Sequence, residues 1–140
     1  MNILIIDGQS GRMGAQLIEG LRKAGLGPEH GITAIGTNAL ATGAMLKAGA
    51  DQAATGENPV LVQCRKADII AGPIGIVLAD ALLGEITPKM AAAVGQSDAR
   101  RILLPVNQCR TSIPGTANKT RAQLTEEAVQ MILQLCKPQG

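Results

Sequence analysis

The chain has 140 residues, 46% of them hydrophobic, and it contains no Phe, Trp or Tyr. This length predicts one domain with a core of aliphatic side chains, and it excludes a two-domain dehydrogenase with a separate substrate domain. The net charge of +2, the scattered basic residues and the lack of aromatic rings for base stacking indicate that neither nucleic acid nor a membrane surface is a partner.

Short apolar runs alternate with segments of helical periodicity along the chain. This alternation is typical of α/β proteins in which helices cover both faces of a mainly parallel sheet. We therefore expect a single Rossmann-like, nucleotide-binding domain over residues 1–140, with three layers and about five strands. In chain order, the pattern predicts a strand at residues 2–6, a helix at about 12–24, a strand at 32–35, a helix at about 39–48, a loop at 51–59, strands at 60–63 and 68–71, helices near 75–83 and 88–95, a strand at 102–106, irregular chain at 110–119 and a helix at about 121–136.

The first strand runs directly into a glycine-rich loop, where the first helix begins. Such a junction lets the backbone approach a pyrophosphate and directs helix N-terminal N–H groups at the anion. We expect this loop to bind a nucleotide, a dinucleotide of the NAD(P) type or another phosphorylated metabolite, although the same glycines would also permit a tight turn without a ligand. The candidate binding residues in the loop are Gly8, Gln9, Ser10, Gly11, Arg12, Met13 and Gly14.

Glycine or polar residues also stand at the carboxyl ends of three other predicted strands. Because parallel strands end at the same edge of a sheet, these residues are expected to line one crevice with the glycine loop, unless they are ordinary turn residues. Thr37 and Asn38 stand where an acidic residue would bind a ribose, so the sequence departs from standard NAD or NADP recognition. Asn38 is equally suited to cap a helix. The further candidates are Thr37, Asn38, Gly72, Pro73, Gly75 and Asn107.

Groups suited to catalysis are few, and the catalytic residues stay unassigned. His30 is the only histidine and the three cysteines form no C-x-x-C pair, so the sequence predicts no metal site. Cys109 lies just past the fifth predicted strand without a nearby histidine, and Glu57 and Asn58 lie in a predicted loop that could reach the crevice. Three functions stay open: a binding or sensing module, a small enzyme on a phosphorylated metabolite whose site is completed across an oligomer interface, and a structural subunit without a ligand.

Location and assembly are also predicted. An odd number of cysteines, and a strand that begins at the N-terminus and leaves no targeting segment, predict a cytoplasmic protein. The longest apolar stretch, Ile69 to Leu83, is interrupted by glycine, proline and Asp80, so it predicts no membrane span. An apolar composition in so small a chain predicts a homo-oligomer, with a dimer as the expected form, assembled through the last helix or residues 75–95.

Two resemblances can be named on these motifs. The loop Gly8-Gln9-Ser10-Gly11-Arg12-Met13-Gly14 resembles the G-x-x-G-R-M-G cofactor loop of dihydrodipicolinate reductase, which uses NADH or NADPH, but that enzyme's histidine-rich catalytic segment and substrate domain have no counterpart. Over its full length, the chain resembles a bacterial family of similarly short proteins described as a domain of unknown function. That second resemblance implies a Rossmann-like domain in a bacterial cytoplasm and implies no activity. It is carried by residues 7–14, 36–38, 54–58, 72–75 and 83–88.

Overall fold

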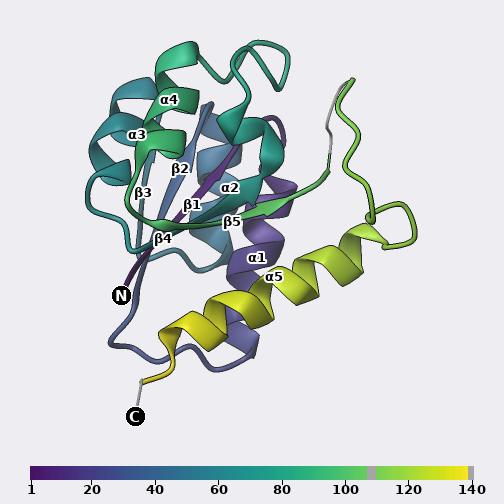
Figure 1. The fold of residues 1–140 in the computed structure, drawn as a ribbon. Coiled ribbons are helices and arrows are strands. Elements are labelled where there is room, and N and C mark those ends of the chain that lie inside the picture. The colour runs from purple at the N-terminus through teal and green to yellow at the C-terminus, as the bar shows by residue number, and fades with distance from the viewer. Residues whose placement is uncertain (107–109, 139–140) are drawn as a thin grey trace.

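The computed structural model describes residues 1–106 and 110–138. Within these residues, five parallel strands form one sheet in the order β3-β2-β1-β4-β5, and helices cover both of its faces (Figure 1). The α/β class and the parallel three-layer arrangement predicted from the sequence are confirmed. The strands are β1 (Asn2–Asp7), β2 (Gly31–Gly36), β3 (Gln52–Thr55), β4 (Ile69–Pro73) and β5 (Arg100–Leu104). The helices are α1 (Arg12–Lys23), α2 (Ala39–Ala48), α3 (Glu57–Cys64), α4 (Pro88–Gln96) and α5 (Arg121–Cys136), with a 3₁₀ turn η1 (Ile74–Val77).

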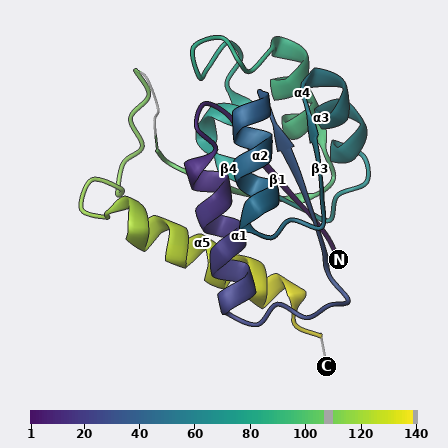
Figure 2. The ribbon, with the colours of Figure 1, turned by 180° about the vertical axis from the view of Figure 1, so that it is seen from behind.

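Alternate strand residues build two separate layers of core. Ile3 and Ile5 of β1 belong to a layer with apolar residues of α1, α2 and α5, whereas Leu4 and Ile6 belong to a layer with α3, α4 and η1. All four side chains are at most 2% exposed, as a central parallel strand requires. From behind, α1 and α2 lie side by side and α5 crosses α1 (Figure 2). Among the described helices, none is both long enough and apolar enough to cross a membrane.

Capping residues fix the starts of the two C-terminal helices. The Thr87 hydroxyl accepts a hydrogen bond from the Met90 N–H at 3.2 Å, and Pro88 follows as the first residue of α4. At α5, Thr120 Oγ1 accepts from the Gln123 N–H at 3.1 Å, while Gln123 Oε1 accepts from the Thr120 N–H at 2.8 Å. These contacts satisfy N–H groups that have no partner inside a helix, which is why both starts could be predicted from the sequence.

The prediction for residues 51–64 is wrong in two places. β3 forms at Gln52–Thr55, inside the predicted loop, and the predicted strand at residues 60–63 belongs to α3. Val60 and Cys64 are four residues apart and both buried, so α3 presents one apolar face to the sheet. Pro59 lies in the first helical turn, where its missing N–H is tolerated.

Two further boundaries differ from the prediction. The helix expected near residues 75–83 is only the short turn η1, and residues 78–87 continue as a compact non-helical segment, called here the 78–87 segment. The fifth strand, expected at residues 102–106, begins two residues earlier and ends at Leu104. Pro105 therefore lies just outside β5, where it removes no ladder hydrogen bond.

Candidate functional site

The parallel register places the candidate residues at the carboxyl edge of the sheet. Asp7 pairs with Gly36, and Gly36 pairs in turn with Thr55, so that β1, β2 and β3 end side by side. β4 adjoins β1 on the other side and ends at Pro73. Asn107 lies outside the described residues, as does Cys109. The candidates at or just after these strand ends are Gly8, Gln9, Ser10, Gly11, Arg12, Met13, Gly14, Thr37, Asn38, Gly72, Pro73 and Gly75.

Asp7, the last residue of β1, forms hydrogen bonds with both ends of the glycine loop. Its side chain is buried, and its two carboxylate oxygens accept hydrogen bonds from the N–H groups of Gly8 and Gly14, each at 2.8 Å. Burial raises the pKa of Asp7 above its usual 3.8, and the two N–H groups offset only part of that effect. Asp7 therefore joins the two ends of the loop and has a structural role.

Two of the loop glycines allow α1 to approach α2 closely. Gly11 has a φ of 74°, and a Cβ at this position would lie 2.6 Å from the Cα of Ala41. A Cβ at Gly14 would overlap the side chain of Met45. Both glycines thus have a packing role that requires no ligand.

Gly72 and Gly75 also face the protein interior. A Cβ at Gly72 would overlap the carbonyl oxygen of Ile6, so this glycine permits the close approach of β4 to β1. A Cβ at Gly75 would be in contact with Ala81 of the 78–87 segment at 3.5 Å. In this conformation, neither glycine presents an open backbone surface to a ligand.

A carboxylate of the chain itself is bound at the glycine loop. The N–H of Gln9 donates to Glu85 Oε1 at 2.7 Å, and the side-chain amide of Asn38 donates to Glu85 Oε2 at 2.6 Å. The same Asn38 amide donates to the carbonyl of Gln9 at 3.0 Å, and Asn38 Oδ1 caps α2 by accepting from the Ala41 N–H. Sequence reasoning selected Gln9 and Asn38 but missed Glu85. Its signals were its place in the 83–88 motif and a carboxylate among mostly apolar residues, 76 residues from Gln9.

The 78–87 segment presents this carboxylate. Its backbone is held by hydrogen bonds from the Asp80 N–H to the Ile86 carbonyl at 2.7 Å and from the Ile86 N–H to the Ala81 carbonyl at 3.1 Å. Asp80, Leu82 and Leu83 have φ values of 67°, 57° and 56°, a left-handed conformation that is unfavourable for leucine. The segment is therefore a strained surface turn, unlike the helices around it.

Next to this turn, a hydroxyl group lacks a partner. A Cβ at Gly8 would lie 2.7 Å from Thr37 Oγ1 and 3.0 Å from Glu85 Oε1, so these three residues meet at one point. Among the described residues, Thr37 Oγ1 is the buried side-chain oxygen that makes no hydrogen bond. Ser10 and Arg12 on the same loop are exposed, and Arg12 forms no ion pair within residues 1–106 and 110–138. The carboxylate of Glu85 thus lies beside the Gln9 N–H, the Asn38 amide and the Thr37 hydroxyl.

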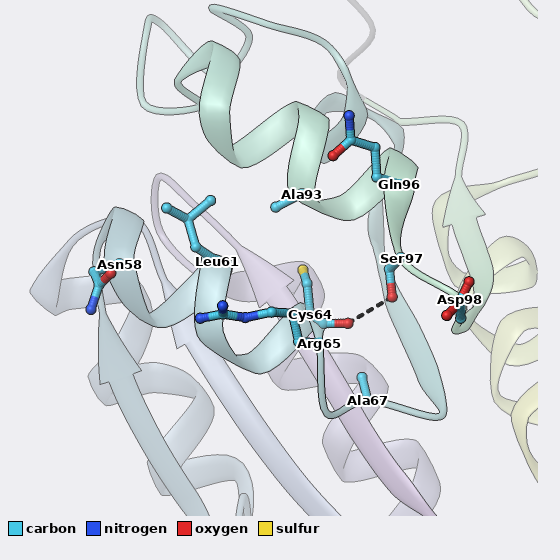
Figure 3. A pocket seen from close by; sticks show the side chains of 9 residues that line it. All are labelled: Asn58, Leu61, Cys64, Arg65, Ala67, Ala93, Gln96, Ser97 and Asp98. Carbon is cyan, nitrogen blue, oxygen red and sulfur yellow. Dashed lines mark hydrogen bonds between the residues drawn. The ribbon is translucent and has the colours of Figure 1, made fainter.

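Other hollows lie elsewhere on the surface. A groove of about 640 Å³ runs between α3 and α4, and it includes no residue of the glycine loop. In Figure 3, Leu61 and the sulfur of Cys64 point from α3 toward α4, and Ser97 Oγ donates to the carbonyl of Cys64 at 2.7 Å. Burial raises the pKa of the Cys64 thiol to about 11, so this thiol is protonated at neutral pH and is a poor nucleophile.

The family model described as "Domain of unknown function (DUF3842)" matches residues 2–137. The chain belongs to this family. A search of the curated proteins found no match. Among solved structures, the DUF3842 chain is similar to a dodecameric FMN-dependent UbiX-like decarboxylase from Escherichia coli O157:H7, with 12% identity over 100% of both chains and a TM-score of 0.44. That likeness is too low to transfer a cofactor or an assembly, and none of the comparisons supports the resemblance to dihydrodipicolinate reductase.

Glu57, another polar candidate in the chain, has a structural partner. Glu57 and Asn58 begin α3 instead of lying in a loop, and Glu57 Oε2 accepts a hydrogen bond from the Thr87 hydroxyl at 2.5 Å. This bond joins the N-terminus of α3 to that of α4. In the part of the chain that the structure describes, no cluster of three His, Cys, Asp or Glu side chains could hold a metal ion.

Proposed function

We propose that the chain binds a small phosphorylated ligand at the glycine loop, with a nucleotide or an NAD(P)-type dinucleotide as the expected class, in exchange for the carboxylate of Glu85. The observation that carries this proposal is the pair of hydrogen bonds from the Gln9 N–H and the Asn38 amide to that carboxylate. An anion is already bound close to the N-terminus of α1, where the helix dipole favours negative charge. The loop therefore has the chemistry that a phosphate requires.

The position of Glu85 supports the proposal that a ligand can replace its carboxylate at the glycine loop. Glu85 belongs to the strained 78–87 segment and is only half-buried, so its release does not require a helix or strand to unfold. A phosphate group carries more charge and more acceptor oxygens than a carboxylate. In place of Glu85, it would accept from the same donors and would also approach the unpaired hydroxyl of Thr37 and the exposed side chains of Ser10 and Arg12.

The proposal divides the sequence candidates by role. Gln9, Ser10, Arg12, Thr37 and Asn38 would contact the ligand. The glycines of the loop, with Met13, would set its conformation and its packing against α2. Gly72, Pro73 and Gly75 would support the edge of the sheet beneath the 78–87 segment.

Ser10→Asp, with Ser10→Asn as its matched control, tests the proposal. Ser10 is exposed, and an added carboxylate at a helix N-terminus favours the folded state, so the Asp variant is expected to fold. Thermal unfolding would be followed with ADP, NAD(H), NADP(H) and pyrophosphate. A binding ligand at a hundred times its dissociation constant stabilises the wild type by about 2.7 kcal/mol. We expect Ser10→Asn to keep this stabilisation and Ser10→Asp to lose it through charge repulsion.

Two results would refute ligand binding. One is that no phosphorylated probe stabilises the wild type, and the other is that Ser10→Asp binds as tightly as Ser10→Asn. Either result would favour the second candidate function, a structural subunit, which the packing roles of Gly11, Gly14 and Gly72 already support. Substitution of Gly11 cannot distinguish the two functions, because its φ of 74° and its contact with Ala41 would destabilise the fold in either case.

A further inference from the structure

Leu83, at the tip of the 78–87 segment, is doubly unfavourable in the isolated chain. It is 94% exposed, and its φ is 56°, in the left-handed region that Gly, Asn and Asp adopt more readily than leucine. The neighbouring Leu82 shares this conformation but is 8% exposed and packs against Gly8, so its apolar side chain is buried within the same chain. A single exposed leucine is ordinary. Leu83 combines this exposure with an unfavourable backbone conformation, and a contact with a second molecule would account for both.

β5 is the edge strand of the sheet and lies beside α5 (Figure 1). Two hollows of about 430 and 460 Å³ share Arg101, Ile102, Glu127 and Met131, so they form one continuous depression, called here the β5–α5 groove. Met131 in the groove is 50% exposed. The outer edge of β5 has no neighbouring strand in the described sheet, and Ile113, Thr116 and Lys119 line one end of the groove.

We propose that Leu83 of one copy inserts into the β5–α5 groove of a second copy. The charges on the two surfaces favour this occupant. Asp80, close to Leu83, is exposed and acidic, whereas Arg100 at the end of the groove is exposed and basic. Within the described residues, neither side chain forms an ion pair, so each is available to the other copy.

The contact is heterologous, because Leu83 and the groove are different surfaces of the same chain. Each copy therefore offers one leucine and one groove, and repeated contacts close into a ring or continue as a filament. The assembly uses both segments that the sequence predicted as interfaces, residues 75–95 and the last helix, but it extends beyond a dimer. This inference does not depend on ligand binding at the glycine loop.

Two variants separate the two halves of the contact. Leu83→Asn removes the apolar side chain and places a residue that tolerates a positive φ, so the monomer is not destabilised. Met131→Gln keeps the length and helix propensity of the side chain but makes the groove polar. Leu46→Gln, at a 50% exposed position of α2 outside both surfaces, is the matched control. Sedimentation velocity and light scattering would measure the assembly at high micromolar concentration.

We expect the wild type and Leu46→Gln to assemble. Leu83→Asn and Met131→Gln are each expected to dissociate, with a dissociation constant raised by about tenfold or more. An equal mixture of the two dissociated variants is expected to form a dimer, because one supplies an intact groove and the other an intact leucine. A monomeric wild type, an unaffected Leu83→Asn variant, or a mixture that remains monomeric would each overturn the proposal.

Discussion

Glu85→Gln is expected to change protein stability and ligand affinity in opposite directions. In the free protein, the Glu85 carboxylate accepts from the Gln9 N–H at 2.7 Å and from the Asn38 amide at 2.6 Å. The glutamine oxygen can replace only one of these acceptors, and its NH₂ group then faces the other donor. A hydrogen bond to a charged group contributes about 1.5–3 kcal/mol, and partial exposure reduces this value. We therefore expect the free protein to lose about 1–2 kcal/mol of unfolding free energy.

The stability that Glu85→Gln removes from the free protein is expected to appear as a higher affinity for the ligand. If a phosphate displaces residue 85, the substitution raises the free energy of the unliganded state and leaves the bound state unchanged. A difference of about 1–2 kcal/mol corresponds to an affinity about 5- to 30-fold higher. Urea unfolding would measure the first effect, and isothermal titration with ADP or pyrophosphate would measure the second.

Asp51→Asn is the matched control for this experiment. Asp51 also accepts from one backbone N–H, that of Ile32 at 2.8 Å, and from one side chain, Arg22 at 3.1 Å, but it lies at the opposite edge of the sheet. We expect a similar loss of stability without a change in affinity. If Glu85→Gln weakens ligand binding, or leaves it unchanged while the ligand binds the wild type, the exchange of Glu85 for a phosphate is refuted.

Three further results are expected from the loop and the core. Gly11→Ala is expected to lower the free energy of unfolding by about 2–4 kcal/mol in urea titrations, because φ is 74° and the new Cβ would meet Ala41 at 2.6 Å; an unchanged midpoint would contradict this packing. Cys64, with its pKa raised to about 11, is expected to resist iodoacetamide at pH 8 until the protein unfolds, as peptide mass spectrometry would show; rapid labelling of the folded protein would contradict its burial. Because the pKa of Asp7 is raised in the folded state, its protonated form adds to the free energy of unfolding; this contribution is full below pH 3.8 and is lost as pH rises through the folded pKa. Asp7→Asn is expected to remove this pH dependence of stability. A titration midpoint of the Asp7 carboxyl at or below 3.8 would contradict the raised pKa.

Periodicity and capping predicted most of the elements because local chemistry determines them. The apolar stripe of α1, the Asn38 cap and the Thr120 capping box each act within a few residues, so the sequence alone identifies them. Val60 was misassigned because a short apolar run suits a helix or a strand equally well, and only burial against the sheet decides between them. β3 was missed because its central residues are alanines, which have low strand propensity and pair only with β2 at the sheet edge.

The sequence predicted that the candidate residues lie together at one edge of the sheet, but it did not predict which side chains are in contact there. Parallel pairing brings the residues after β1, β2 and β4 together, and this follows from the alternation of strands and helices. The contact of Glu85 with Gln9 could not be predicted, since it depends on three left-handed residues in a turn that the sequence assigned to a helix. Leu82 and Glu85 of this turn contact Gly8 and Gln9, which are more than 70 residues away in sequence, so a pattern within a short window contains no information about these contacts.

The central position of β1 also constrains how the protein is synthesised. β1 pairs with β2 on one side and with β4 on the other, but β4 begins only at Ile69. A nascent chain that has reached α3 therefore has one open edge of β1, apolar on both faces and with its backbone N–H and C=O groups unpaired. Until β4 emerges from the ribosome, that edge can pair with a strand of another nascent chain, so this interval of translation is the one at which a chaperone would protect the protein most.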